Sequence, residues 1–300
     1  MIIDVHVHVY PPDVISGWER IADREAYFAE LVRGKVHRWA DADDLLSAMD
    51  EDGVDESWIC GFGFKDIGLC RLCNDYVLDA AARSKGRLRA MCVVPPMSRG
   101  AEAEAERCAE LGAIGVGEIF PEGQDWRICD IRETWRLAAV CHERGMFAMI
   151  HAAEPVGREY PGKGRTGPRE AYLMASNHPE LKIILAHWGG GLFIYESMRD
   201  VSGTLKNVWY DTAAAPFLYG SNIFECVRMS CVGEKILYGS DYPILRLPRF
   251  EKMLDESPLH GEELDALMSG NASKLLASLG RDGRSSAKCC DEVSRKSAKS

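Results

Sequence analysis

The 300-residue chain is predicted to be an α/β protein with a (β/α)8 TIM-barrel fold. Short runs rich in β-branched and aromatic residues alternate with stretches of helical spacing, and the alternation repeats eight times. The repeats fill about 250 residues, the usual size of such a barrel, and fit it better than a doubly wound sheet. In addition, residue types that bind metals recur near the ends of the runs, where barrel enzymes place catalytic groups.

The expected strands begin with the apolar run IIDVHVHV. In order along the chain they are residues 2–9, 56–62, 88–94, 113–120, 147–152, 182–188, 207–213 and 235–241. The segments between them, such as those beginning DADDLL, AEAEAE, IRETWR and GPREAY, show helical periodicity. Several carry Asp or Glu early and end at Gly or before Pro, as helices often do.

One barrel domain is expected to span residues 1–280. Residues 10–40 form a long insertion after the first strand, which would lie on the catalytic face of a barrel and could act as a lid. Residues 281–300 are small and polar without periodicity, which predicts a disordered tail.

Composition limits the classes of function. The chain is 46% hydrophobic and 27% charged, as is typical of soluble globular proteins, and no apolar run approaches the roughly 18 to 20 residues of a membrane span. It begins directly with a strand and lacks the features of a secretory signal, so a cytoplasmic location is expected. A net charge of −10 argues against a nucleic-acid partner.

Cysteine usage indicates reduced thiols. The eleven cysteines are an odd number, and several lie in apolar surroundings. The single Cys-x-x-Cys, Cys70 and Cys73, has no second such pair and falls in a stretch of helical periodicity. Helix packing is therefore favoured over a zinc site.

His6 and His8 alternate with apolar residues in the first strand. Residues two apart in a strand face the same side, so both imidazoles converge on one point. Neutral imidazole is the commonest metal ligand in proteins, and His-x-His can supply half of a metal site.

Four further residues of metal-ligand type lie near the ends of later strands: Glu118, His151, His187 and Asp241. They are separated by 33, 36 and 54 residues, which correspond to about one, one and two β/α units. Each has an ordinary alternative explanation as a core histidine, a helix-capping carboxylate or a turn residue. Together, six such residues at strand ends predict a metal site.

These motifs carry a family resemblance. DVHVH, the histidine of MIHAAE, ILAHWGGG and YGSDYP together resemble the amidohydrolase superfamily, in particular its amidohydrolase-related branch. That branch contains metal-dependent hydrolases, lactonases, hydratases and decarboxylases of the aminocarboxymuconate-semialdehyde type. The resemblance covers residues 1 to about 280 and implies a (β/α)8 enzyme. Dimers are common in the branch, which makes a homodimer possible.

The resemblance also implies roles for site residues. His6, His8, His151 and Asp241 would be metal ligands, and His187 would bind a second metal or polarise the substrate. Glu118 departs from the decarboxylases of the branch, which usually have no ligating carboxylate at strand four. GVGEI is instead similar to the Gly-Glu-Ile of TatD-like nucleases, in which the glutamate bridges two metals. One or two divalent ions are therefore expected, zinc first and manganese next.

The ligand set favours hydrolysis. A divalent ion lowers the pKa of a bound water to near 7 and polarises a carbonyl group. In this superfamily the strand-eight aspartate, here Asp241, takes the proton from that water and passes it to the leaving group. His187 is the second predicted catalytic residue.

The predicted substrate is a small, anionic molecule. The loop after strand five concentrates four basic residues: Arg158, Lys163, Arg165 and Arg169. They would bind a carboxylate or phosphate of the substrate, or else they only keep a solvent-exposed loop soluble. Trp188 could line an apolar pocket, although core packing explains it equally well.

The leading prediction is a hydrolase that opens a lactone or amide. The alternative is non-oxidative decarboxylation on the same scaffold, and a TatD-like phosphodiesterase is third. A catalytically inactive barrel is disfavoured because the full ligand set is present.

Overall fold

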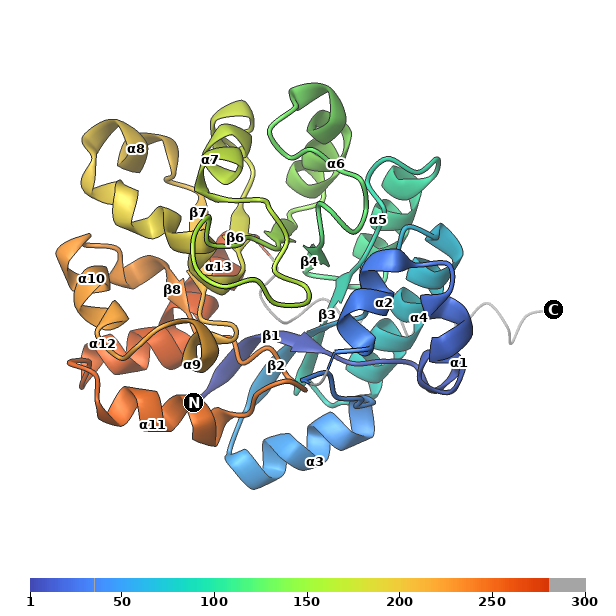
Figure 1. Ribbon diagram of the computed structural model, residues 1–300, viewed down its shortest axis with the longest axis horizontal. Helices are drawn as coiled ribbons and strands as arrows, with labels where there is room; N and C mark the ends of the chain where they lie inside the picture. The colour runs from blue at the N-terminus through green and yellow to red at the C-terminus, as the bar shows by residue number, and fades with distance from the viewer. Residues whose placement is uncertain (35, 281–300) are drawn as a thin grey trace, which may run out of the picture.

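Eight parallel strands form one sheet in a computed structural model that describes residues 1–34 and 36–280 (Figure 1). Sheet order follows chain order from β1 to β8, with helices outside, which confirms the predicted TIM barrel. The predicted tail, residues 281–300, lies outside the described residues. The strands are β1 (Ile3–His8), β2 (Glu56–Cys60), β3 (Leu88–Cys92), β4 (Gly115–Ile119), β5 (Phe147–Ile150), β6 (Ile183–Leu185), β7 (Val208–Asp211) and β8 (Ile236–Leu237).

The first and last strands meet where the barrel closes. The Val5 amide donates to the Tyr238 carbonyl at 2.9 Å, and the His8 amide donates to the Tyr242 carbonyl at 2.8 Å. Between them the Asp241 amide donates to the His6 carbonyl at 3.0 Å. Main-chain bonding therefore places Asp241 beside the two histidines of β1.

Helices cover the outside of the barrel (Figure 1). They are α1 (Pro12–Ala22), α2 (Ala26–Val32), α3 (Ala42–Asp52), α4 (Ile67–Arg83), α5 (Ala101–Glu110), α6 (Ile131–Glu143), α7 (Pro168–Asn177), α8 (Arg199–Thr204), α9 (Ala215–Leu218), α10 (Ile223–Met229), α11 (Leu247–Asp255), α12 (Glu262–Asp265) and α13 (Asn271–Ser278). Two segments are 3-10 helices, η1 (His187–Ser197) and η2 (Gly233–Lys235), and η3 (Ala266–Gly270) is a π-helix.

The sequence explains the ends of these helices. Asp41 caps α3 by accepting the amides of Asp43 and Asp44, and Gly53 ends it with φ of 74°. Asp66 and Asp130 cap α4 and α6 in the same manner. Cys70 and Cys73 lie buried within α4, and the Cys70 thiol donates to the Phe64 carbonyl, so this pair packs a helix as predicted.

The insertion after β1 contains α1 and α2. Phe28 of α2 is fully buried, with its ring centroid 5.0 Å from those of Phe62 and Phe64 after β2. This aromatic packing attaches the insertion to the carboxyl end of the barrel. No helix in the described ranges is long and apolar enough to cross a membrane.

All eight strands stop before their predicted ends. β6 ends at Leu185 and β8 at Leu237, whereas His187 and Asp241 follow in irregular backbone with φ of 53° and 67°. Left-handed backbone is costly for residues other than glycine, although Asp and His tolerate it better than most. The backbone leaves the sheet at the positions where the predicted site residues turn inward.

Candidate active site

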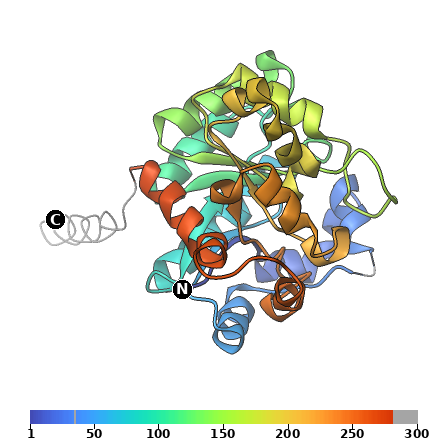
Figure 2. The same ribbon diagram turned by 90° about the vertical axis from the view of Figure 1, so that its left-hand side faces the viewer.

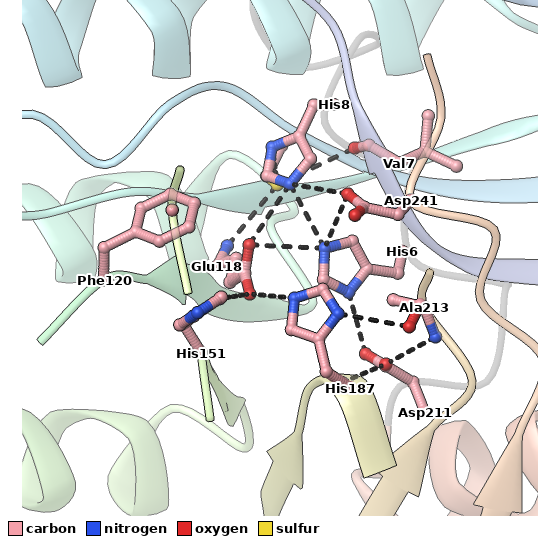
Figure 3. A network of polar contacts seen from close by, with 12 residues as sticks. His6, Val7, His8, Glu118, Phe120, His151, His187, Asp211, Ala213 and Asp241 are labelled. Carbon is pink, nitrogen blue, oxygen red and sulfur yellow. Dashed lines mark hydrogen bonds and ion pairs between the residues drawn. The ribbon is translucent and has the colours of Figure 1, made fainter. Parts of the chain in front are cut away.

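The six predicted metal-site residues meet in one buried cluster (Figure 3). Glu118 lies at its centre. Its Oε2 atom is 3.3 Å from His6 Nε2 and 3.2 Å from His8 Nε2, whereas its Oε1 atom is 3.0 Å from His151 Nδ1 and 3.4 Å from His187 Nε2. One carboxylate thus contacts four imidazoles from three other strands or strand ends.

Asp241 completes the cluster on the other side of the two β1 histidines. Its Oδ1 atom is 3.8 Å from His6 Nε2 and 3.9 Å from His8 Nε2, and these two nitrogens are 3.1 Å apart. Two groups of three residues have ligand atoms within 4.8 Å of one another: His6, Glu118 and His187, and His6, His8 and Asp241. His6 belongs to both groups.

Hydrogen bonds on the outer side of the cluster determine which imidazole nitrogen faces inward. His6 Nδ1 lies 2.8 Å from Asp211 Oδ2, His187 Nδ1 lies 3.1 Å from the Ala213 carbonyl, and His8 Nδ1 lies 3.3 Å from the Gly61 carbonyl. Since these oxygens can only accept, each Nδ1 carries the proton in the neutral ring. The three Nε2 lone pairs therefore face the cluster.

His151 is oriented the other way round. Its Nε2 atom donates to the Lys163 carbonyl at 2.9 Å, so Nδ1 faces Glu118. Inward imidazole lone pairs beside two carboxylates are the ligand chemistry of a divalent transition metal, and the outer hydrogen bonds are the support that such ligands need. The residues present fit a divalent ion.

The electrostatics of the cluster favour positive charge. Burial alone would lower the pKa of His6, but the carboxylates of Glu118 and Asp211 outweigh it and raise that pKa well above its usual value. Burial would raise the pKa of Glu118, but His6, His151 and His187 hold it well below its usual range. A metal ion and protons would therefore compete for the same sites.

Two residues beside the cluster, Asp211 and Cys60, were not predicted from the sequence. Asp211 ends β7 fully buried, and its Oδ1 atom also accepts the His187 and Ala213 amides at 2.9 and 3.0 Å. Cys60 ends β2, with its sulfur 3.4 Å from His8 Nδ1 and from the Glu118 amide. Their position at strand ends was a usable signal, but an aspartate and a cysteine there resemble ordinary turn and core residues.

The charged side chains predicted to bind substrate face solvent or their own loop. Arg158 and Arg165 are exposed, as is Arg169. The Lys163 side chain is buried, and its ammonium group donates to the Val156 and Arg158 carbonyls at 3.1 and 3.2 Å. The charge of Lys163 therefore organises its own loop.

Arg165 borders a cavity of about 560 Å³ between the β4–α6 and β5–α7 loops. Its apolar wall comes from Pro121, Trp126 and Ile128, and Glu122 also lines it. Arg165 thus lies where a ligand on the catalytic face could reach it, while substrate binding by Arg158, Lys163 and Arg165 stays a prediction.

Trp188 is fully buried and packs against other aromatic side chains. Its ring centroid is 5.5 Å from that of Phe193 and 5.6 Å from that of Phe224 on α10. These contacts agree with the packing interpretation that the sequence left open for this residue.

We expect Trp188→Ala to lower the free energy of unfolding by about 3 to 5 kcal/mol, because it leaves a large cavity in the core. The measurement is urea denaturation followed by circular dichroism. Trp135→Ala, at a ring that is 52% exposed on α6, serves as the control and should cost about 1 kcal/mol or less. A Trp188→Ala protein of unchanged stability that binds substrate poorly would instead place this ring in the pocket.

Comparison with known proteins places this site in context. A family model described as "Amidohydrolase" matches residues 3–277. No curated protein sequence matches the chain significantly. Among solved structures, 5-carboxyvanillate decarboxylase from Sphingomonas paucimobilis is similar with a TM-score of 0.72 at 17% identity, over 92% of this chain and 98% of that one.

Two other similar structures are a second decarboxylase and a hydratase. Dihydroxybenzoic acid decarboxylase from Polaromonas sp. JS666, with bound manganese and the inhibitor 2-nitroresorcinol, has a TM-score of 0.68 at 15% identity, covering 94% of this chain and 98% of that one. 4-Oxalomesaconate hydratase from Rhodopseudomonas palustris has a TM-score of 0.63 at 18% identity, covering 93% and 97%. At such identities the likeness establishes the shared fold.

Proposed function

This chain belongs to the amidohydrolase family, and from that premise we propose that it is a metal-dependent decarboxylase, which removes CO2 without oxidation from a small carboxylic acid. The observation that carries the proposal is the cluster of four imidazoles and two carboxylates at the strand ends, on a fold that known decarboxylases share. The comparisons thus favour the alternative drawn from the sequence over its leading prediction of hydrolysis.

His6, His8 and Asp241, with Glu118, His151 and His187 beside them, are the residues that would hold the ion. A divalent ion bound there would polarise the substrate and offset the negative charge of its carboxylate. Zinc suits the imidazole-rich set, and the manganese in one of the similar decarboxylases supports manganese as the next candidate.

Decarboxylation breaks a carbon–carbon bond, and the electron pair left on carbon must then accept a proton. We assign its delivery to Asp241 and His187, whose side chains are the most exposed of the six, at 10% and 9%. The reaction uses no water as a reagent, which suits a centre where the His6 and Glu118 side chains are at most 1% exposed.

A second candidate is hydrolysis of a lactone or amide. It is favoured by the geometry of Glu118, whose two oxygens contact different pairs of histidines, His6 and His8 on one side and His151 and His187 on the other. Such a carboxylate is suited to bridge two ions, which is an arrangement that activates water. The phosphodiesterase prediction gains no support from a chain with a net charge of −10.

We expect protein purified without chelator to contain a divalent metal and to release CO2 from small aromatic or unsaturated carboxylic acids. Elemental analysis and a CO2 assay make the measurement. Removal of the metal with a chelator should abolish release, and zinc or manganese should restore it. Opening of lactones or amides without CO2 release would support the second candidate, and a protein that binds neither metal would refute both.

A further inference from the structure

The imidazole of His151 depends on the main chain of a neighbouring loop for its outer hydrogen bond. This side chain is 7% exposed, and its Nε2 atom donates to the Lys163 carbonyl at 2.9 Å. Lys163 belongs to residues 162–166 of the β5–α7 loop, a segment called the strap below. A side chain that bonds to a carbonyl is only as well oriented as the backbone that carries that carbonyl.

Glu122, on the loop after β4, holds the strap from one side. Its Oε1 atom accepts the Arg165 amide at 2.8 Å and the Thr166 hydroxyl at 2.9 Å. Hydrogen bonds to a carboxylate are stronger than bonds to a neutral group, so these two hold the strap against the β4–α6 loop.

The insertion after β1 holds the strap from the other side. Tyr27 of α2 donates its hydroxyl proton to the Gly162 carbonyl at 2.8 Å. Figure 2 shows the β5–α7 loop, in yellow-green, and the blue helices of the insertion projecting on the same side of the barrel. The strap is thus anchored at both ends, with Lys163 between the anchors.

Gly164 brings the strap, Glu122 and His151 into close contact. A Cβ atom at this position would lie 2.9 Å from Glu122 Oε2 and 3.3 Å from His151 Cδ2, and the residue has φ of 72°. A side chain here would strain the backbone and displace the Glu122 carboxylate or the His151 ring. Because Glu122 also bonds to the next two residues, we expect its removal to shift the backbone that carries the Lys163 carbonyl.

We propose that Glu122 is a positioning residue, which holds the strap so that the Lys163 carbonyl fixes His151 with Nε2 protonated and Nδ1 directed into the metal site. The effect of Glu122 on metal binding rests on the proposed function, but the position of the His151 proton can be observed without any metal. It also assigns to Lys163 a role through its carbonyl group, in place of the charged side chain that the sequence suggested.

The test compares Glu122→Ala with Glu122→Gln. Glutamine keeps an acceptor oxygen for the strap, whereas alanine keeps none. Proton NMR of protein labelled with ¹⁵N-histidine detects the Nε2 proton of His151, and competition with a chromophoric chelator gives the dissociation constant for zinc. The matched control is Glu159→Gln. This side chain is 90% exposed and lies 3.7 Å from the Lys163 ammonium, so the variant removes a charge beside Lys163 while it leaves the Glu122 bonds in place.

Glu122→Ala should lose the exchange-protected His151 Nε2 proton signal, with and without zinc, and raise the zinc dissociation constant about 10- to 100-fold. Glu122→Gln should retain the signal, and Glu159→Gln should match the wild type. If Glu122→Ala fails to fold, Thr166→Val, which removes one of the two bonds to Glu122, should still weaken the signal. An intact signal in a folded Glu122→Ala or Thr166→Val protein would overturn the inference, whereas wild-type protein that binds neither zinc nor manganese would refute the proposed function alone.

Discussion

Replacement of Glu118 by alanine is expected to reduce turnover by about a thousandfold or more. Its carboxylate is the only group that contacts all four site histidines within the cluster described above. Without it, His6, His8, His151 and His187 lose their shared negative partner, and bound metal should fall as well. A thousandfold loss corresponds to roughly 4 kcal/mol of transition-state stabilisation, which is within the contribution of a well-placed metal ion.

The measurement combines turnover with metal content per chain by elemental analysis. About two ions falling to about one would favour the hydrolase candidate with a bridging Glu118, whereas a single ion per wild-type chain would favour the decarboxylase.

Glu104→Gln is the matched control for the loss of a buried carboxylate. Glu104 is 2% exposed on α5, where it accepts bonds from Asn74 and Arg107. This variant should lose stability while keeping its metal. If turnover of Glu118→Ala stays within tenfold of the wild type, Glu118 has no essential part in the reaction.

Replacement of Asp211 by asparagine is expected to weaken zinc binding about 10- to 100-fold and to lower turnover by about two to four orders of magnitude. Asp211 Oδ2 accepts the His6 Nδ1 proton, which leaves the Nε2 lone pair free. An asparagine can present its NH2 group there, and the His6 ring would then protonate at Nε2 and direct a proton into the cluster. The variant keeps the size of the side chain while reversing the direction of the hydrogen bond.

Chelator competition and steady-state kinetics measure these effects. Asp200→Asn, at an exposed position on α8, is the control for the change of charge. Thermal unfolding of both variants separates lost metal affinity from lost stability. Asp211→Asn with wild-type zinc affinity would show that the His6–Asp211 bond has no part in forming the metal site.

Much of the fold follows from local sequence patterns. The eight strands and their helices were predictable because burial on both strand faces produces short apolar runs, and helix ends carry their own signals, as with Asp41 and Gly53 around α3. The convergence of His6, Glu118, His151, His187 and Asp241 was also predictable, since a closed parallel barrel brings all strand ends to one face.

The sequence by itself therefore determined the barrel, the six residues of the cluster and the family. Only the tertiary structure decided the contacts around them. Asp211 supports His6 from a strand far away in the chain, Lys163 contacts His151 through its carbonyl group, and Trp188 packs into the core. Sequence periodicity records which residues are buried and on which face, but it holds no information on side-chain orientation or on the path of an irregular loop. Those depend on hydrogen bonds between segments that meet only when the barrel closes.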